Sequence, residues 1–270
     1  MRELRHMKLP LILTKRLLLN PYAIGWGIAF MYFWIAMGAF IESSSVPKSR
    51  AVYYTAGWYG VIVLLSTSTF ATSIAIMIYY QSGGLSFLTR FSKLTPKYYL
   101  LSLYFVMIVT TIIVSALMAV GVISFFSYHF GETIEPKNWG LFILDMILSG
   151  IFYLPLALLL EELTVVTSRK LSSAISFIPL VFAYLFGFSY LNINLGNVVY
   201  YSPFISIQVI GMQSFFSKPI PLNYSDVHGP TLNVDYSIIS VVVWSIVLSV
   251  ASMLLFRRLY YKSLEEGRIL

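Results

Sequence analysis

Six long apolar stretches divide the sequence, and they constrain the fold more than any other feature. They lie at about residues 22–41, 52–80, 98–126, 141–160, 171–191 and 236–256. As a helix, each stretch is long enough to cross a hydrocarbon core of about 30 Å. The sequence therefore predicts an all-α integral membrane protein, with six transmembrane helices in a single domain of residues 1–270.

The composition agrees with a membrane protein and excludes several kinds of chemistry. Of the 270 residues, 58% are hydrophobic and 11% are charged, whereas soluble domains carry about 25% charged residues. The absence of cysteine excludes disulfides, thiolate metal sites and cysteine nucleophiles. The net charge of +7 does not indicate a nucleic-acid partner, because the basic residues lie in short segments between the apolar stretches.

The distribution of these basic residues predicts the orientation of the chain. With six spans, fourteen of the 18 lysines and arginines fall on one side of the membrane. The other side holds Lys48, Arg50, Lys137 and Lys218. Because positive residues collect on the inner side, we expect both termini to be cytoplasmic in a multi-pass protein of the cell membrane.

A short basic segment, residues 82–97, separates the second and third apolar stretches and has the sequence SGGLSFLTRFSKLTPK. A helix over Gly84–Leu94 would place Arg90 opposite an apolar arc of about 120°. The side chains of that arc are Phe87, Leu88, Phe91 and Leu94. Gly83-Gly84 can supply a turn before this helix, and Thr95-Pro96 can end it. The pattern predicts a small amphipathic helix on the cytoplasmic side.

Two positions are open to this helix: it can lie on lipid headgroups, or it can dock in a groove of a partner protein. The flanking stretches, 52–80 and 98–126, would each form a helix of about 44 Å, which exceeds the hydrocarbon core. They would hold the segment away from the lipid, and this favours docking.

Two further segments are predicted to be helical without crossing the membrane. Residues 11–20, between Pro10 and Pro21, are apolar and basic, which is typical of an interfacial helix. A signal peptide is the alternative, but Lys15 and Arg16 interrupt its apolar region. Residues 198–216 are uncharged but too polar for a lipid-facing helix, and a seventh span would send the basic C-terminal residues outside. We expect helical segments that re-enter the outer leaflet.

The chain here resembles a known family, the type-2 ATP-binding-cassette exporters. A Gly-Gly-initiated helix ending in Leu-Thr-Pro, between the second and third of six spans, is similar to the cytosolic coupling helix of that family. The family also has an N-terminal interfacial helix and a re-entrant helical element before the last span, which match residues 11–20 and 198–216.

The resemblance implies a membrane subunit that is not an enzyme and binds no cofactor itself. ATP and Mg²⁺ would be bound by a separate ATPase subunit, and a second membrane subunit would complete the translocation path. The ATPase-coupling interface would then comprise Phe87, Leu88, Arg90, Phe91 and Leu94.

Polar residues within the spans are candidates for a translocation path. Ser66, Thr69 and Ser73 share one face of the second span, which favours helix packing but also suits a polar substrate path. Gly25 and Gly27 in the first span can allow close approach to it. Asp145 is the one acid deep in a span, where it can form a structural hydrogen bond or act at an outer gate.

Other candidate chemistry is weaker. Asn223-Tyr224-Ser225 is a glycosylation sequon, for which a chance match is the alternative. Glu161-Glu162 is similar to a motif of membrane proteases, but Val166 replaces its arginine and no histidine lies in a span. The chain has no P-loop motif. A secondary transporter or a channel is the main alternative function, and an intramembrane enzyme is the second.

Overall fold

The computed structural model describes residues 8–91, 95–167 and 172–260, most of which are helical. Within these ranges six helices are long and apolar enough to cross a membrane. They are Pro21–Ser45, Lys48–Ile78, Lys97–Phe130, Trp139–Leu163, Ala174–Asn192 and Val234–Leu255. Each one overlaps a stretch predicted from the sequence, so the all-α fold with six helices able to span a membrane is confirmed and the chain is a multi-pass membrane protein.

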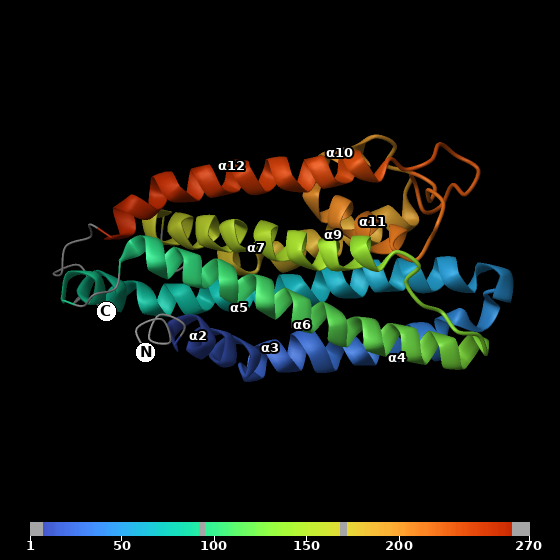
Figure 1. The fold of residues 1–270 in the computed structure, drawn as a ribbon, viewed down its shortest axis with the longest axis horizontal. Coiled ribbons are helices and arrows are strands. Elements are labelled where there is room, and N and C mark those ends of the chain that lie inside the picture. Colours follow the sequence, from blue (N-terminus) through green and yellow to red (C-terminus); the bar gives the residue numbers. More distant parts are fainter. Residues whose placement is uncertain (1–7, 92–94, 168–171, 261–270) are drawn as a thin grey trace.

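The helices follow one another in a bundle of nearly parallel elements (Figure 1). The first half comprises α2 (Lys8–Leu18), α3 (Pro21–Ile24), a π-helical turn η1 (Gly25–Ala29), α4 (Phe30–Phe40), short 3-10 turns at Glu42–Ser45 and Lys48–Arg50, α5 (Ala51–Phe91) and α6 (Pro96–Phe130). The second half comprises α7 (Trp139–Thr167), α8 (Ser172–Ser176), α9 (Ile178–Asn192), α10 (Val198–Tyr201), α11 (Pro203–Gln213) and α12 (Val234–Tyr260). The first span is formed by α3, η1 and α4 together.

Helix α5 is the centre of the bundle. In its most apolar stretch 89% of the residues are buried, compared with 22% for α12 and 28% for the first span. It packs against α6, α7, α9 and α11. The outward faces of α12, α9 and the first span expose large apolar side chains, as expected for helices that face lipid.

Helix α2 confirms the N-terminal helix expected at residues 11–20, although it begins at Lys8 and ends at Leu18. Leu13, Thr14 and Leu17 are buried, and the helix packs against α6. Leu11 and Ile12 are more than half exposed. An apolar outer face next to basic side chains is typical of a helix at the membrane surface.

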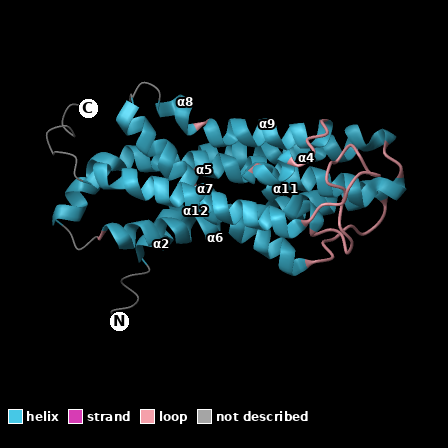
Figure 2. Ribbon diagram, turned by 90° about the horizontal axis from the view of Figure 1, so that it is seen from above, coloured by secondary structure: helices cyan, strands magenta, loops and turns pink. Residues whose placement is uncertain are grey.

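The segment after the fifth span is helical, as expected, but contains no further span. Helix α11 has 11 residues, or about 16 Å, which is too short to cross the bilayer. Every residue from Pro203 to Gln213 is buried, so its polar side chains face protein. It lies toward the end of the bundle where the loops gather (Figure 2).

The turn predicted at Gly83-Gly84 is wrong. Helix α5 continues through both glycines to Phe91, because a glycine inside a helix costs only about 1 kcal/mol and nothing else in the segment breaks the helix. The boundary at Thr95-Pro96 is confirmed: the Thr95 side chain accepts a hydrogen bond from the Tyr98 backbone N–H, and Pro96 opens α6. Leu94 lies outside the described residues.

Glycines allow the spans to approach one another closely. A Cβ atom on Gly27 would lie 2.9 Å from the Phe70 ring of α5, which confirms the expected approach of the first span. Gly25 has no neighbour within 4 Å of such an atom, so the same expectation is wrong for Gly25. On α7, a Cβ atom on Gly150 would lie 2.8 Å from the Ile108 Cα atom of α6.

The contact at Gly150 gives a test of the fold. Gly150→Ala should lower the free energy of unfolding by about 1–3 kcal/mol, because the Ile108 backbone cannot move aside as a flexible side chain would. Gly140→Ala is the matched control on the same helix: its nearest neighbour would be 3.5 Å away, and it should be neutral or slightly stabilising. Thermal unfolding in detergent measures both, and equal midpoints would contradict this packing of α6 on α7.

Candidate functional site

The hydroxyl-bearing face of α5 is buried inside the bundle. The Ser66 hydroxyl donates to the Gly27 carbonyl of the first span. Thr69 and Ser73 donate to the carbonyls four residues before them, each at 3.0 Å. The Ser66 bond joins α5 to the first span, and all three hydroxyls have a partner, while a role in a translocation path stays a prediction.

A second contact links α5 to α7 and was not foreseen from the sequence. The Ser68 hydroxyl lies 2.7 Å from the Tyr153 hydroxyl, which also donates to the Leu64 carbonyl at 3.3 Å. Both side chains are fully buried. Tyr153 is a tyrosine in the middle of an apolar span, and this could have indicated a buried hydrogen bond.

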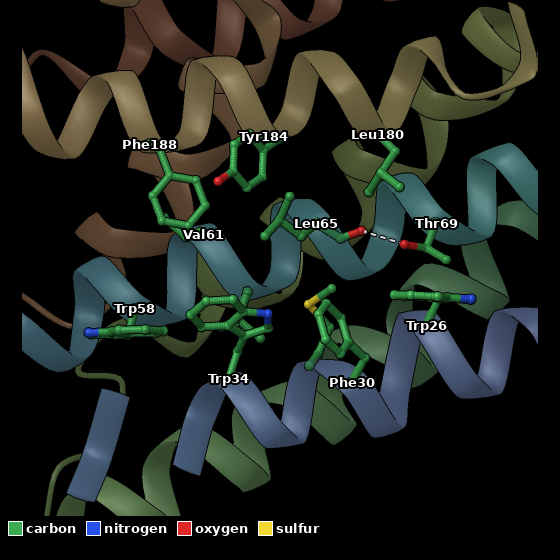
Figure 3. Close-up of a pocket in the computed structure, with 12 residues that line it drawn as sticks. Trp26, Phe30, Trp34, Trp58, Val61, Leu65, Thr69, Leu180, Tyr184 and Phe188 are labelled. Atoms are coloured by element: carbon green, nitrogen blue, oxygen red, sulfur yellow. Dashed lines mark hydrogen bonds between the residues drawn. The ribbon is translucent and has the colours of Figure 1, made fainter. Parts of the chain in front are cut away.

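An aromatic groove of about 170 Å³ lies between the first span, α5 and α9 (Figure 3). Its lining is Trp26, Phe30, Met31, Trp34, Trp58, Val61, Ile62, Leu65, Thr69, Leu180, Tyr184 and Phe188. The Thr69 hydroxyl is already bonded to the Leu65 carbonyl, so the groove offers stacking and van der Waals contacts but no charge. It suits an apolar group. The spacing of Trp26, Phe30 and Trp34 was a sequence signal for an aromatic face on the first span. The sequence could not show that α9 supplies the opposite wall of the groove.

A polar hollow of about 770 Å³ opens at the loop end of the bundle. Lys137, Asn138 and Trp139 line one side of it, and Gln213 and Asp235 contribute from other segments. The end of α11 is fixed there, because the Ser214 carbonyl accepts hydrogen bonds from the backbone N–H groups of Lys137 and Asn138, both at 2.9 Å.

Asp145 lies inside the bundle on α7, as expected, with only 1% of its surface exposed. The hydrogen bond to a neighbouring span that the sequence favoured is not seen for its Oδ1 atom, which has no partner. Its Oδ2 atom faces Gly211 of α11. Tyr59 of α5 lies against the same glycine, and its buried hydroxyl also has no partner.

Glu161 and Glu162 occupy the opposite end of α7. Each side chain is 1% exposed, and none of the four carboxylate oxygens has a hydrogen-bond partner. Arg169 and Lys170, the next basic residues along the chain, lie outside the described residues. Among the residues that the structure describes, no cluster of three or more histidines, cysteines or acids could hold a metal ion.

Asn223 has a structural role in the loop before α12. Its side chain is 3% exposed, and its Oδ1 atom accepts hydrogen bonds from the backbone N–H groups of Leu195 and Gly196. The next residue, Tyr224, stacks on Tyr53 of α5 with ring centroids 4.7 Å apart. These contacts give the Asn223 side chain a structural role that does not require a glycan, and glycosylation of Asn223 stays a prediction.

The predicted coupling interface lies on the end of α5. The backbone at Phe87, Leu88, Arg90 and Phe91 is helical, as expected, although it belongs to α5 and not to a separate helix. Compared with known protein families, with curated proteins and with solved structures, the chain matches none.

The tyrosines Tyr153 and Tyr59 test which polar contacts hold the bundle together. Tyr153→Phe removes a buried hydrogen bond between α5 and α7 and should lower the free energy of unfolding by about 0.5–1.5 kcal/mol. Tyr59→Phe should leave it unchanged or raise it, because the hydroxyl that it removes is buried without a partner. Thermal unfolding of both variants in detergent is the measurement. A larger loss of stability for Tyr59→Phe than for Tyr153→Phe would contradict the hydrogen bond of Tyr153 between α5 and α7.

Proposed function

We propose that the chain is the membrane subunit of an ATP-binding-cassette exporter of the type-2 family. The observation that carries the proposal is the length of α5: the helix has 41 residues and continues to Phe91, which makes it about 61 Å long, roughly twice the hydrocarbon core. Its extension beyond the span predicted at residues 52–80 is about 16 Å long and brings the basic amphipathic segment out of the hydrocarbon core. A helix in that position is suited to transmit movement from a soluble partner to the central helix of the bundle.

Other elements at the same end support the proposal. The start of α2 and the end of α12 lie at the end of the bundle where α5 meets α6 (Figure 1). Exposed Lys8, Lys15 and Arg16 on α2 add to the positive charge there. The same end carries α2, the extension and exposed basic residues, which supports the proposal that it is the cytoplasmic end.

In this proposal the work is divided between subunits. A separate ATPase subunit binds ATP and Mg²⁺ and docks on the extension of α5, so this chain is not an enzyme. Two membrane subunits, identical or related, form the path between them in the lipid bilayer. Because α5 is buried against α6, α7, α9 and α11, a push on its extension acts on most of the bundle at once.

Single cysteines test the orientation, since the natural chain has no cysteine. Lys97→Cys and Val227→Cys place a thiol at exposed positions at opposite ends of the bundle. In intact cells, a membrane-impermeant maleimide should label the Val227 variant at once and the Lys97 variant only after lysis. Labelling in the reverse order would contradict cytoplasmic termini.

Variants of the extension test the coupling. Phe91→Ala or Leu88→Asp should weaken binding of the ATPase subunit or uncouple ATP hydrolysis from transport, because each apolar anchor contributes about 1.5–3 kcal/mol of burial. Arg90→Ala is the control on the opposite face of the predicted arc and should have a smaller effect. The measurement is copurification and substrate-stimulated ATP hydrolysis in lipid discs. Wild-type coupling in both apolar variants would contradict docking at this segment.

A further inference from the structure

The carboxyl group of Asp145 is enclosed by three helices without a charged or hydrogen-bonded partner for its Oδ1 atom. A Cβ atom on Gly211 would lie 3.0 Å from Oδ2 and 3.1 Å from the Tyr59 ring. The backbone of α11 therefore lies close to the carboxyl group, and any side chain at position 211 would crowd both Asp145 and Tyr59. The Tyr59 ring also packs on Phe142 of α7 and on Phe215, with centroids 5.2 Å away in both cases, and these contacts hold it in place.

No group in these surroundings can neutralise a negative charge. The titratable side chains that face Asp145 are two tyrosines, Tyr59 on α5 and Tyr153 on α7 itself. Helix α11 has no titratable residue, and neither has α6 over residues 105–127 nor α12 over residues 237–255. Helix α9 adds only Tyr184 and Tyr190, and α8 adds none. The basic side chains at this end of the bundle, Lys48, Arg50, Lys137 and Lys218, are all exposed.

The position of Gly211 adds a second unfavourable influence on a charged carboxylate. Gly211 lies in the last turn of α11, which ends at Gln213. The C-terminal end of a helix carries partial negative charge on its last carbonyl groups. A buried anion beside it is opposed both by the loss of water and by this dipole. A bound metal cation does not suit the site, because no cluster of acids or histidines surrounds Asp145 among the described residues.

We propose that Asp145 is a proton-binding site whose occupancy is linked to the position of α11. While α11 packs on the carboxyl group, Asp145 holds the proton as a neutral acid. When α11 moves away, water reaches the group, which releases the proton to that water and becomes a carboxylate. The polar hollow beside the end of α11 provides the side from which water would enter.

Infrared spectroscopy tests the bound proton directly, because the chain contains only three aspartates, Asp145, Asp226 and Asp235. In protein labelled with ¹³C-aspartate, the wild type near neutral pH should show an isotope-shifted carbonyl band of a protonated carboxyl group. Asp145→Asn should lose this band, and Asp226→Asn, the control in the outer loop, should keep it. Absence of the band in the wild type, or its survival in Asp145→Asn, would overturn the proposal.

The dependence of stability on pH is an independent readout. If the folded protein holds a proton that the unfolded chain releases, stability falls as pH rises. The wild-type melting temperature should then decline by about 3 °C per pH unit relative to Asp145→Asn, which has nothing to titrate at this position. Identical slopes in the two proteins would overturn the proposal.

Gly211→Ala tests the link to α11. The added methyl group would lie 3.0 Å from Asp145 Oδ2, so α11 and the carboxyl group should move apart and the infrared band should disappear at a lower pH than in the wild type. Gly140→Ala, on the same helix as Asp145 but without a close neighbour, should leave the titration unchanged. An unchanged titration in Gly211→Ala would separate proton binding from α11 and overturn the linkage.

Discussion

The hydrocarbon core of a bilayer offers no hydrogen-bond partner, so each polar group in a span must find one inside the protein. This constraint explains the arrangement around α5. Ser66 bonds to the first span, and Ser68 bonds to Tyr153 of α7. Burial of apolar surface alone does not select which helices associate in lipid, because the lipid tails are equally apolar. Hydroxyl contacts and close glycines therefore specify the neighbours of the central helix.

The same constraint determines where the short helix α11 can lie. Its two glutamines reach backbone groups of other segments: Gln208 donates to the Gly187 carbonyl at 3.2 Å, and Gln213 accepts from the Ile220 N–H at 2.9 Å. A helix too short to cross a membrane is tolerated in a membrane protein where protein surrounds its ends. Asp145 beneath it is one of the exceptions, since its Oδ1 atom has no partner, and an unpartnered ionisable group inside a membrane protein is a candidate for function.

Much of this architecture could be predicted because it depends on local properties of the chain. The length of an apolar stretch predicts a span, and Thr95-Pro96 predicts a boundary, which the structure places at the start of α6. The Gly83-Gly84 turn failed because glycine permits a turn without requiring one. The aromatic groove and the Tyr153 contact were missed because they depend on which helices become neighbours, and the unpartnered Asp145 Oδ1 could not be foreseen for the same reason.

The central claim is that the extension of α5 serves a separate motor subunit. Purification of the chain from its native membrane in mild detergent tests it most directly, with mass spectrometry of the purified complex and an assay of its ATP hydrolysis. The account predicts a P-loop ATPase in stoichiometric amount, with ATP hydrolysis that depends on the membrane subunit. A chain that purifies alone and is free of ATPase activity, while still folded by its thermal unfolding transition, would contradict it.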